Sequence, residues 1–94
     1  MAVVWTRTSE LSLLEILFYI QTKFGVLVAE QYYFDVLETI EAIEKLPDLF
    51  PIFSNNSQTR KAIINKKTAL YYKTDNDTLF LLAFYDTRKG THKL

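Results

Sequence analysis

Residues 60–86 read RKAIINKKTALYYKTDNDTLFLLAFYD, and this stretch decides the fold class. It contains three runs rich in β-branched and aromatic residues, at 60–65, 68–74 and 78–86. The polar segments Lys66-Lys67 and Asp75-Asn76-Asp77 separate these runs, so the stretch predicts three antiparallel strands joined by tight turns. The last run, TLFLLAFYD, is apolar at nearly every position. It predicts a central strand covered on both faces, or by helices on one face and a partner on the other.

Two amphipathic helices are predicted upstream of these strands, at 9–24 and 28–45, and Gly25 ends the first of them. Thr8 or Ser9 is the expected N-cap of the first helix, because a hydroxyl there can accept a hydrogen bond from a free backbone amide. The second helix has the clearest pattern, since its apolar residues recur at steps of four and three. These residues, which we expect in the core, are Ala29, Tyr33, Val36, Ile40 and Ile43.

A short run at 2–6, AVVWT, predicts a first strand that has no neighbouring strand in the sequence. We expect it to pair with the run 78–86. Residues 47–58 are predicted to be irregular, with a turn at Asn55-Asn56. The expected fold is therefore α+β, a single domain over 1–94 in the order β-α-α-β-β-β, with an αα-hairpin packed on one face of a small, mostly antiparallel sheet.

The charges are divided between the two halves of the chain, although its net charge is zero. Residues 1–50 carry three bases and eight acids, a net charge of −5, whereas residues 51–94 carry eight bases and three acids, a net charge of +5. The acidic half is the predicted helical half, and the basic half contains the predicted meander. We therefore expect one cationic surface on the sheet that binds an anionic macromolecule.

Several classes of function are disfavoured by composition. The chain has no cysteine, one histidine (His92) and two glycines, so we expect no metal site, no cofactor and no glycine-rich phosphate loop. The longest apolar stretch is too short to span a bilayer, and no signal peptide is apparent. The expectation is a cytoplasmic protein that does not bind membranes.

The basic residues of the second half are the first candidates for binding a partner or target. With an interleaved tyrosine, they are Lys61, Lys66, Lys67, Tyr71, Lys73, Lys89 and Lys93. Cations and aromatic rings on one sheet are typical of a nucleic-acid surface, but lysines at strand edges also prevent edge-to-edge pairing. Strand alternation places Tyr71 with Lys73 on one face and Tyr72 with Leu70 on the other, so we expect one tyrosine in the core and one exposed. Tyr71 is the better candidate for the exposed one, and a bulge in the strand would reverse the two.

An ordered set of short motifs carries a resemblance to a known family. These motifs are Phe24-Gly25, Leu46-Pro47, Arg60-Lys61, Leu70-Tyr71-Tyr72-Lys73 and Asp86-Thr87-Arg88. Together with the order of predicted elements, they resemble the ParE/RelE superfamily of bacterial toxins, which includes plasmid stabilisation proteins. The resemblance covers essentially the whole chain. It implies a toxin of a type II toxin–antitoxin system that inhibits growth and is neutralised by a cognate antitoxin protein.

The resemblance leaves two mechanisms open. ParE-like members inhibit an essential protein target such as DNA gyrase and are not enzymes. RelE-like members are ribosome-dependent endoribonucleases that cut mRNA. For that case, the resemblance implies Arg60 and Arg88 as phosphate clamps and Tyr85 or His92 as the proton-transfer residue. The zero net charge and the acidic helices favour the ParE-like mechanism, because ribosomal RNA would repel them. A third hypothesis is a non-toxic homodimer in which acidic helices meet basic sheets.

Overall fold

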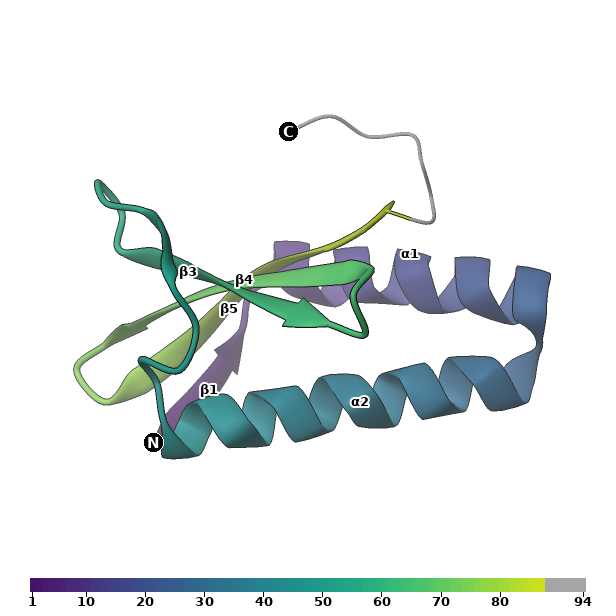
Figure 1. Cartoon of the computed structure of the whole chain (residues 1–94), viewed down its shortest axis with the longest axis horizontal. Coiled ribbons are helices and arrows are strands. Elements are labelled where there is room, and N and C mark those ends of the chain that lie inside the picture. The colour runs from purple at the N-terminus through teal and green to yellow at the C-terminus, as the bar shows by residue number, and fades with distance from the viewer. Residues whose placement is uncertain (88–94) are drawn as a thin grey trace.

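The computed structural model describes residues 1–87 and contains two helices and five strands (Figure 1). Along the chain these are β1 (Ala2–Trp5), α1 (Arg7–Phe24), α2 (Val26–Lys45), β2 (Ile52–Ser54), β3 (Thr59–Ile64), β4 (Thr68–Asp75) and β5 (Thr78–Asp86). The helices form a hairpin on one face of a single sheet. The predicted α+β class, the αα-hairpin and the three-strand meander are confirmed.

The sheet has the strand order β1-β5-β4-β3-β2. β1 pairs with β5 in parallel, from Ala2 opposite Thr78 to Trp5 opposite Leu81, and the other pairs are antiparallel. The predicted pairing of the first strand with 78–86 is therefore confirmed. The prediction that residues 47–58 contain no strand is wrong, because β2 lies there. β2 has only three residues, sits at the sheet edge and pairs irregularly with β3, so it leaves no alternating pattern in the sequence.

Two of the predicted local features are corrected by the structure. Thr6 rather than Thr8 or Ser9 is the N-cap of α1, since its side chain accepts a hydrogen bond from the Ser9 amide. In α2, Tyr32 is buried and Tyr33 is exposed, the reverse of the prediction. The steps of the buried face are three, four, four and three residues. Both patterns fit a helical face, and only the packing against the sheet decides between adjacent tyrosines.

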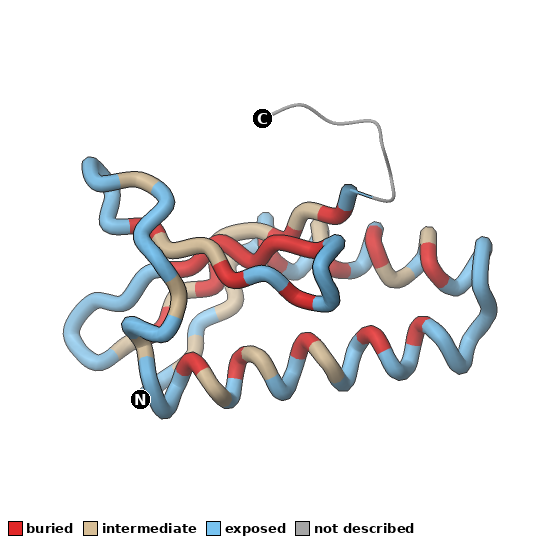
Figure 2. The backbone as a smooth tube through the Cα atoms, in the orientation of Figure 1, coloured by how far each residue is buried: buried red, intermediate tan, exposed pale blue. Residues whose placement is uncertain are grey.

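The core lies between the hairpin and the facing side of the sheet (Figure 2). Ile16, Ile20, Val36 and Ile43 come from the helices and are essentially inaccessible. The sheet contributes mainly Ala62, Ile64, Leu70, Tyr72, Leu79, Leu81 and Phe84. Covering a sheet on one side in this way leaves its other face, the outer sheet face, as a separate surface.

β5 contains a bulge near its middle. Tyr71 pairs with Ala83 and Tyr72 pairs with Leu81, so Leu82 is an extra residue in the ladder. The extra residue shifts the alternation, and both Leu81 before it and Phe84 after it are buried in the core. The helices therefore cover one face of this strand, while the residues on its outer face are half-buried.

Hydroxyl groups of Thr6 and of α1 form hydrogen bonds with backbone groups of β5 at the point where β1 stops pairing with it. The Thr6 hydroxyl donates to the Leu81 carbonyl at 2.8 Å, and the Ser12 hydroxyl accepts from the Phe84 amide at 2.9 Å. Ser9 is fully buried between them and donates to the Thr6 carbonyl at 2.7 Å. Backbone groups of β5 at and beyond the end of β1 thus have side-chain partners from Thr6 and α1.

Thr6→Ala should lower the free energy of unfolding by about 1–2 kcal/mol, because it removes both the helix cap and the hydrogen bond to Leu81. Urea unfolding followed by circular dichroism measures this loss. Thr8→Ala is the matched control, since Thr8 is exposed on the first turn of the same helix. Equal losses in both variants would contradict the assigned cap.

Candidate functional site

The outer sheet face is the side of the sheet that the helices do not cover. Cross-strand pairs place Lys61 opposite Tyr71, and Ala69 lies between Ile63 on one side and Tyr85 on the other. These residues alternate with the core residues along their strands, so they share the outer face. The face combines cationic, aromatic and aliphatic side chains, which suits it to contact with another macromolecule.

An aromatic cluster with a lysine over it occupies part of this face. Phe53 of β2 meets Tyr71 edge-on with 5.1 Å between ring centroids. The Lys61 ammonium lies 5.6 Å from the Phe53 centroid and 5.9 Å from that of Tyr71. Such contacts stabilise a cation at the ring face and hold its position. The lysine is thereby placed over a largely apolar surface.

The prediction for Tyr71 is wrong, and the prediction for Tyr72 is confirmed. Tyr71 is only 9% exposed, because Phe53 and Lys61 pack against it on the outer face. Tyr72 is 0% exposed, and its hydroxyl donates to the Pro47 carbonyl at 2.9 Å. Alternation places the two rings on opposite faces as expected, but the unpredicted strand β2 supplies the aromatic ring beside Tyr71.

A cavity of about 280 Å³ opens beside this cluster. Its lining comes from β3, the β3–β4 turn, β4 and the end of β5, and consists of Lys61, Ile63, Lys66, Lys67, Thr68, Ala69, Tyr71, Tyr85 and Thr87. It brings together five of the residues that the sequence singled out, three of them lysines. Ammonium groups around one cavity favour an anionic occupant such as a carboxylate or a phosphate.

Tyr71 has a buried hydroxyl that makes no hydrogen bond with any described residue. Its pKa is raised above the ordinary value of 10.0, first by burial and then by the nearby Tyr85. Tyr71 therefore has a neutral hydroxyl at physiological pH, and this hydroxyl is buried although the residue lines the cavity.

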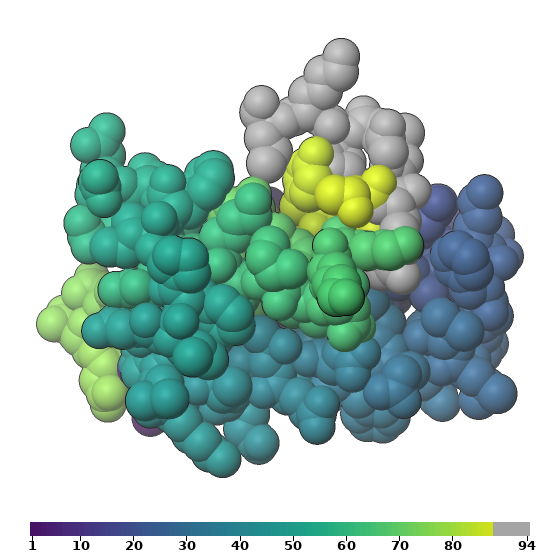
Figure 3. All heavy atoms as spheres, in the orientation of Figure 1, coloured from purple at the N-terminus to yellow at the C-terminus, as the bar shows by residue number. Residues whose placement is uncertain are grey.

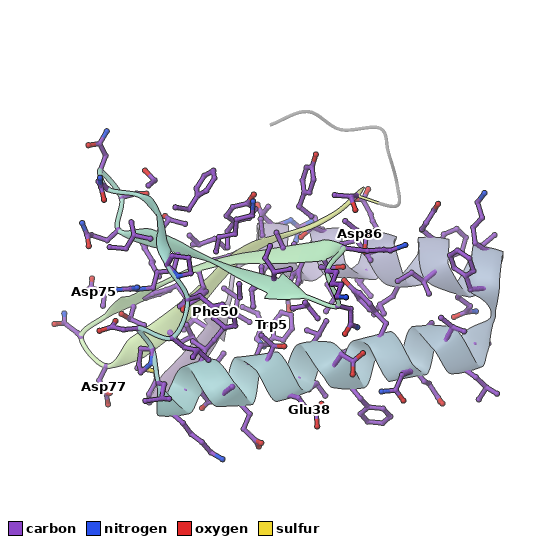
Figure 4. The ribbon with its side chains drawn as sticks, in the orientation of Figure 1. Trp5, Glu38, Phe50, Asp75, Asp77 and Asp86 are labelled. Atoms are coloured by element: carbon purple, nitrogen blue, oxygen red, sulfur yellow. The ribbon has the colours of Figure 1, made fainter. Side chains whose placement is uncertain are left out.

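Arg60 lies on the opposite side of the sheet from this cavity. It shares the core-facing side of β3 with Ala62, where Nη1 donates to the Phe50 carbonyl at 2.7 Å and Nη2 lies 3.1 Å from Asp48 Oδ1. Arg60 thus links the segment after α2 to the sheet. Phe50 belongs to this segment, and its half-buried side chain packs against the core (Figure 4). The structure does not bring Arg60 and Tyr85 to one site.

Of the remaining predicted residues, the structure describes only Lys73. Lys73 is exposed and pairs with Phe80, so it follows Tyr71 along the outer face without lining the cavity. Arg88, Lys89, His92 and Lys93 lie outside the described residues. Phe53 was missed by the sequence analysis, although the apolar run Leu49–Phe53 that contains it was a usable signal.

The acidic residues of the helical half lie away from the cavity. Glu30, Glu38, Glu41 and Glu44 are exposed on α2, and Glu38 points away from the sheet (Figure 4). In the space-filling view, the green surface of β3 and β4 lies above the blue surface of α2 and adjoins it (Figure 3). Two side-chain contacts join acids of the first half to the second half in the described residues: Arg60 pairs with Asp48, and the Asn65 side-chain amide donates a hydrogen bond to the Asp35 carboxylate. In the part of the chain that the structure describes, neither helix has the length and apolarity needed to cross a membrane.

Comparison with known proteins finds similarity in structure but not in sequence. No protein-family model matches the chain, and no curated protein sequence does. The fold is similar to a chain of the solved structure "Chromosomal ParDE TA system from P. aeruginosa", with a TM-score of 0.78. The match covers 92% of this chain and 95% of that chain at 15% sequence identity. The fold expected from the resemblance to ParE-like toxins is thereby confirmed.

Replacing each of the two adjacent tyrosines by phenylalanine should have different effects on stability. Tyr72→Phe should lower the free energy of unfolding by about 1 kcal/mol, because the Pro47 carbonyl loses its donor. Tyr71→Phe should leave it unchanged or raise it slightly, because the lost hydroxyl is buried without a partner among the described residues. Urea unfolding at neutral pH measures both, and each variant is the control for the other.

Alkaline pH gives a second readout on Tyr71. Because the folded chain holds this hydroxyl protonated above 10.0, folding stability should fall as pH rises beyond that value. Tyr71→Phe should remove part of this fall. An identical pH dependence in the variant and the unmodified chain would contradict the raised pKa.

Proposed function

We propose that this chain is the toxin component of a type II toxin–antitoxin system, ParE-like in mechanism, that acts in the cytoplasm on an essential protein target such as DNA gyrase. The fold shared with a chain of a ParDE system is the observation that carries the proposal. The ordered motifs of the sequence support it as well, because they resemble those of the same family. The proposed partner is a cognate antitoxin that masks the toxin.

The outer sheet face is the proposed docking surface for the antitoxin. Lys61, Lys66 and Lys67 supply positive charge around one cavity, and Phe53 and Ile63 are more than half exposed beside it. An acidic segment of the partner would be steered by the lysines and retained by the apolar side chains.

The position of Arg60 supports a mechanism without RNA cleavage. In a nuclease, the residue that clamps the phosphate and the residue that transfers the proton must both reach the same scissile phosphate. Arg60 faces the core side of the sheet and contacts Asp48, whereas Tyr85 lines the outer cavity. A second candidate, a RelE-like mRNA endoribonuclease, keeps some support because the outer cavity gathers three lysines and two tyrosines.

Expression of the chain in a sensitive bacterium should arrest growth with DNA damage and intact mRNA, because a gyrase inhibitor traps cleaved DNA. Co-expression of the small reading frame next to the gene should restore growth if that frame encodes the antitoxin. Northern blots and a DNA-damage reporter distinguish the mechanisms. Rapid mRNA cleavage that is abolished by Tyr85→Phe, but not by the control Tyr33→Phe, would replace the proposal with the nuclease.

Reversing the charge of the cavity lysines should weaken antitoxin binding. The triple variant Lys61→Glu, Lys66→Glu, Lys67→Glu should lose about tenfold or more in affinity and show a flatter salt dependence, because charge steers the encounter. Isothermal titration calorimetry at two salt concentrations measures both. Lys23→Glu with Lys45→Glu is the control on the helices. Equal losses in the two variants would place the antitoxin elsewhere.

A further inference from the structure

The β3–β4 turn, residues 65–67, links the surface of α2 to the outer cavity. Lys66 and Lys67 line the outer cavity of about 280 Å³. Asn65, the residue before them, lines a different cavity of about 290 Å³ beside α2, together with Asp35 of that helix. Three consecutive residues therefore connect a helix with two of the lysines on the proposed docking surface.

The backbone of this turn has a conformation that side chains rarely adopt. Asn65 has a φ of 54° and Lys66 has a φ of 65°. The Lys67 amide donates to the Ile64 carbonyl at 3.3 Å, which closes the turn around these two residues. Asparagine tolerates the left-handed region, but the second position of such a turn is usually glycine, because any Cβ there comes close to the following carbonyl. The conformation at Lys66 therefore needs support from contacts outside the turn.

Contacts at both ends of the turn provide this support. The Asn65 side-chain amide donates a hydrogen bond to Asp35 Oδ2, and Gln31 Nε2 donates to Asp35 Oδ1 at 3.1 Å. A hydrogen bond to a carboxylate is stronger than one between neutral groups. At the other end, the Lys67 carbonyl accepts from the Thr87 amide at 2.9 Å. The turn is thus held between α2 and the end of β5.

We propose that Asp35 is a positioning residue for the outer cavity. Through Asn65, it holds the β3–β4 turn in the left-handed conformation that places Lys66 and Lys67 at the cavity. The inference rests on the proposed function, because it takes the outer sheet face as the docking surface. The charge of Asp35 alone predicts the opposite effect, since a carboxylate near the cavity repels an acidic partner. Asp35 therefore strengthens binding of an acidic segment in spite of its own charge.

The test uses the full chain and a fluorescein-labelled peptide that alternates glutamate with leucine, with binding measured by fluorescence anisotropy. Asp35→Ala should weaken binding about fivefold, because the hydrogen bond to the turn is lost. Asp35→Asn removes the same charge but keeps an acceptor for Asn65, so its affinity should stay within about twofold of that of the unmodified chain. Glu38→Ala is the matched control, since it removes a charge from the exposed side of α2 about one helical turn further along. It should leave binding unchanged.

NMR spectroscopy examines the turn without any ligand. The three-bond coupling between the amide and α protons of a residue depends on its φ. In Asp35→Ala, the couplings of Asn65 and Lys66 should therefore change from those of the unmodified chain, and in Asp35→Asn they should be retained. Circular dichroism checks that each variant is folded.

Two results would overturn the role of Asp35. One is unaltered couplings in Asp35→Ala, and the other is equal weakening of the peptide by Asp35→Ala and Asp35→Asn, because loss of charge would then explain the effect. The triple variant Lys61→Glu, Lys66→Glu, Lys67→Glu separates this failure from that of the docking surface. If the triple variant binds the peptide as tightly as the unmodified chain, the outer sheet face is not the docking surface, and the cavity role of Asp35 fails with it. If only the triple variant loses binding, the docking surface stands and the role of Asp35 alone is contradicted.

Discussion

The attachment of α1 to the bulged strand β5 is the constraint on which the rest of the structure depends. β1 covers only the first half of β5, and the bulge at Leu82 interrupts the ladder beyond it. The hydroxyls of Thr6 and Ser12 pair with the backbone groups that are left. This fixes the start of α1 against β5. The hairpin follows, and the side of the sheet that it covers becomes the core.

Covering one side of the sheet gives the molecule two surfaces of different character. The outer sheet face has lysines and aromatic rings around a cavity, whereas the exposed side of α2 has carboxylates. The charge separation that the sequence indicated thus becomes a separation in space, with the contacts of Arg60 with Asp48 and of Asn65 with Asp35 as bridges.

Much of the fold and part of the candidate site followed from local patterns. The run 78–86 predicted the central strand, and the charges of the second half predicted Lys61, Lys66 and Lys67 as a group. Arg60 shows the limit of that reasoning, because strand alternation alone does not say which face the helices cover. The same limit applies to Tyr32 and Tyr33 of α2, since neighbouring residues fit an apolar face about equally well until the helix is packed.

By itself, the sequence determined the class of the fold, the order of its main elements, the pairing of the first strand with 78–86 and the division of charge. These features depend on periodicity, turn residues and composition, which are properties of short segments. Only the tertiary structure decided the bulge, the edge strand β2 and the burial of Tyr71 beside Phe53. Those features result from contacts between segments far apart in the chain, where the exact register and the covering side chain decide which residues stay in solvent.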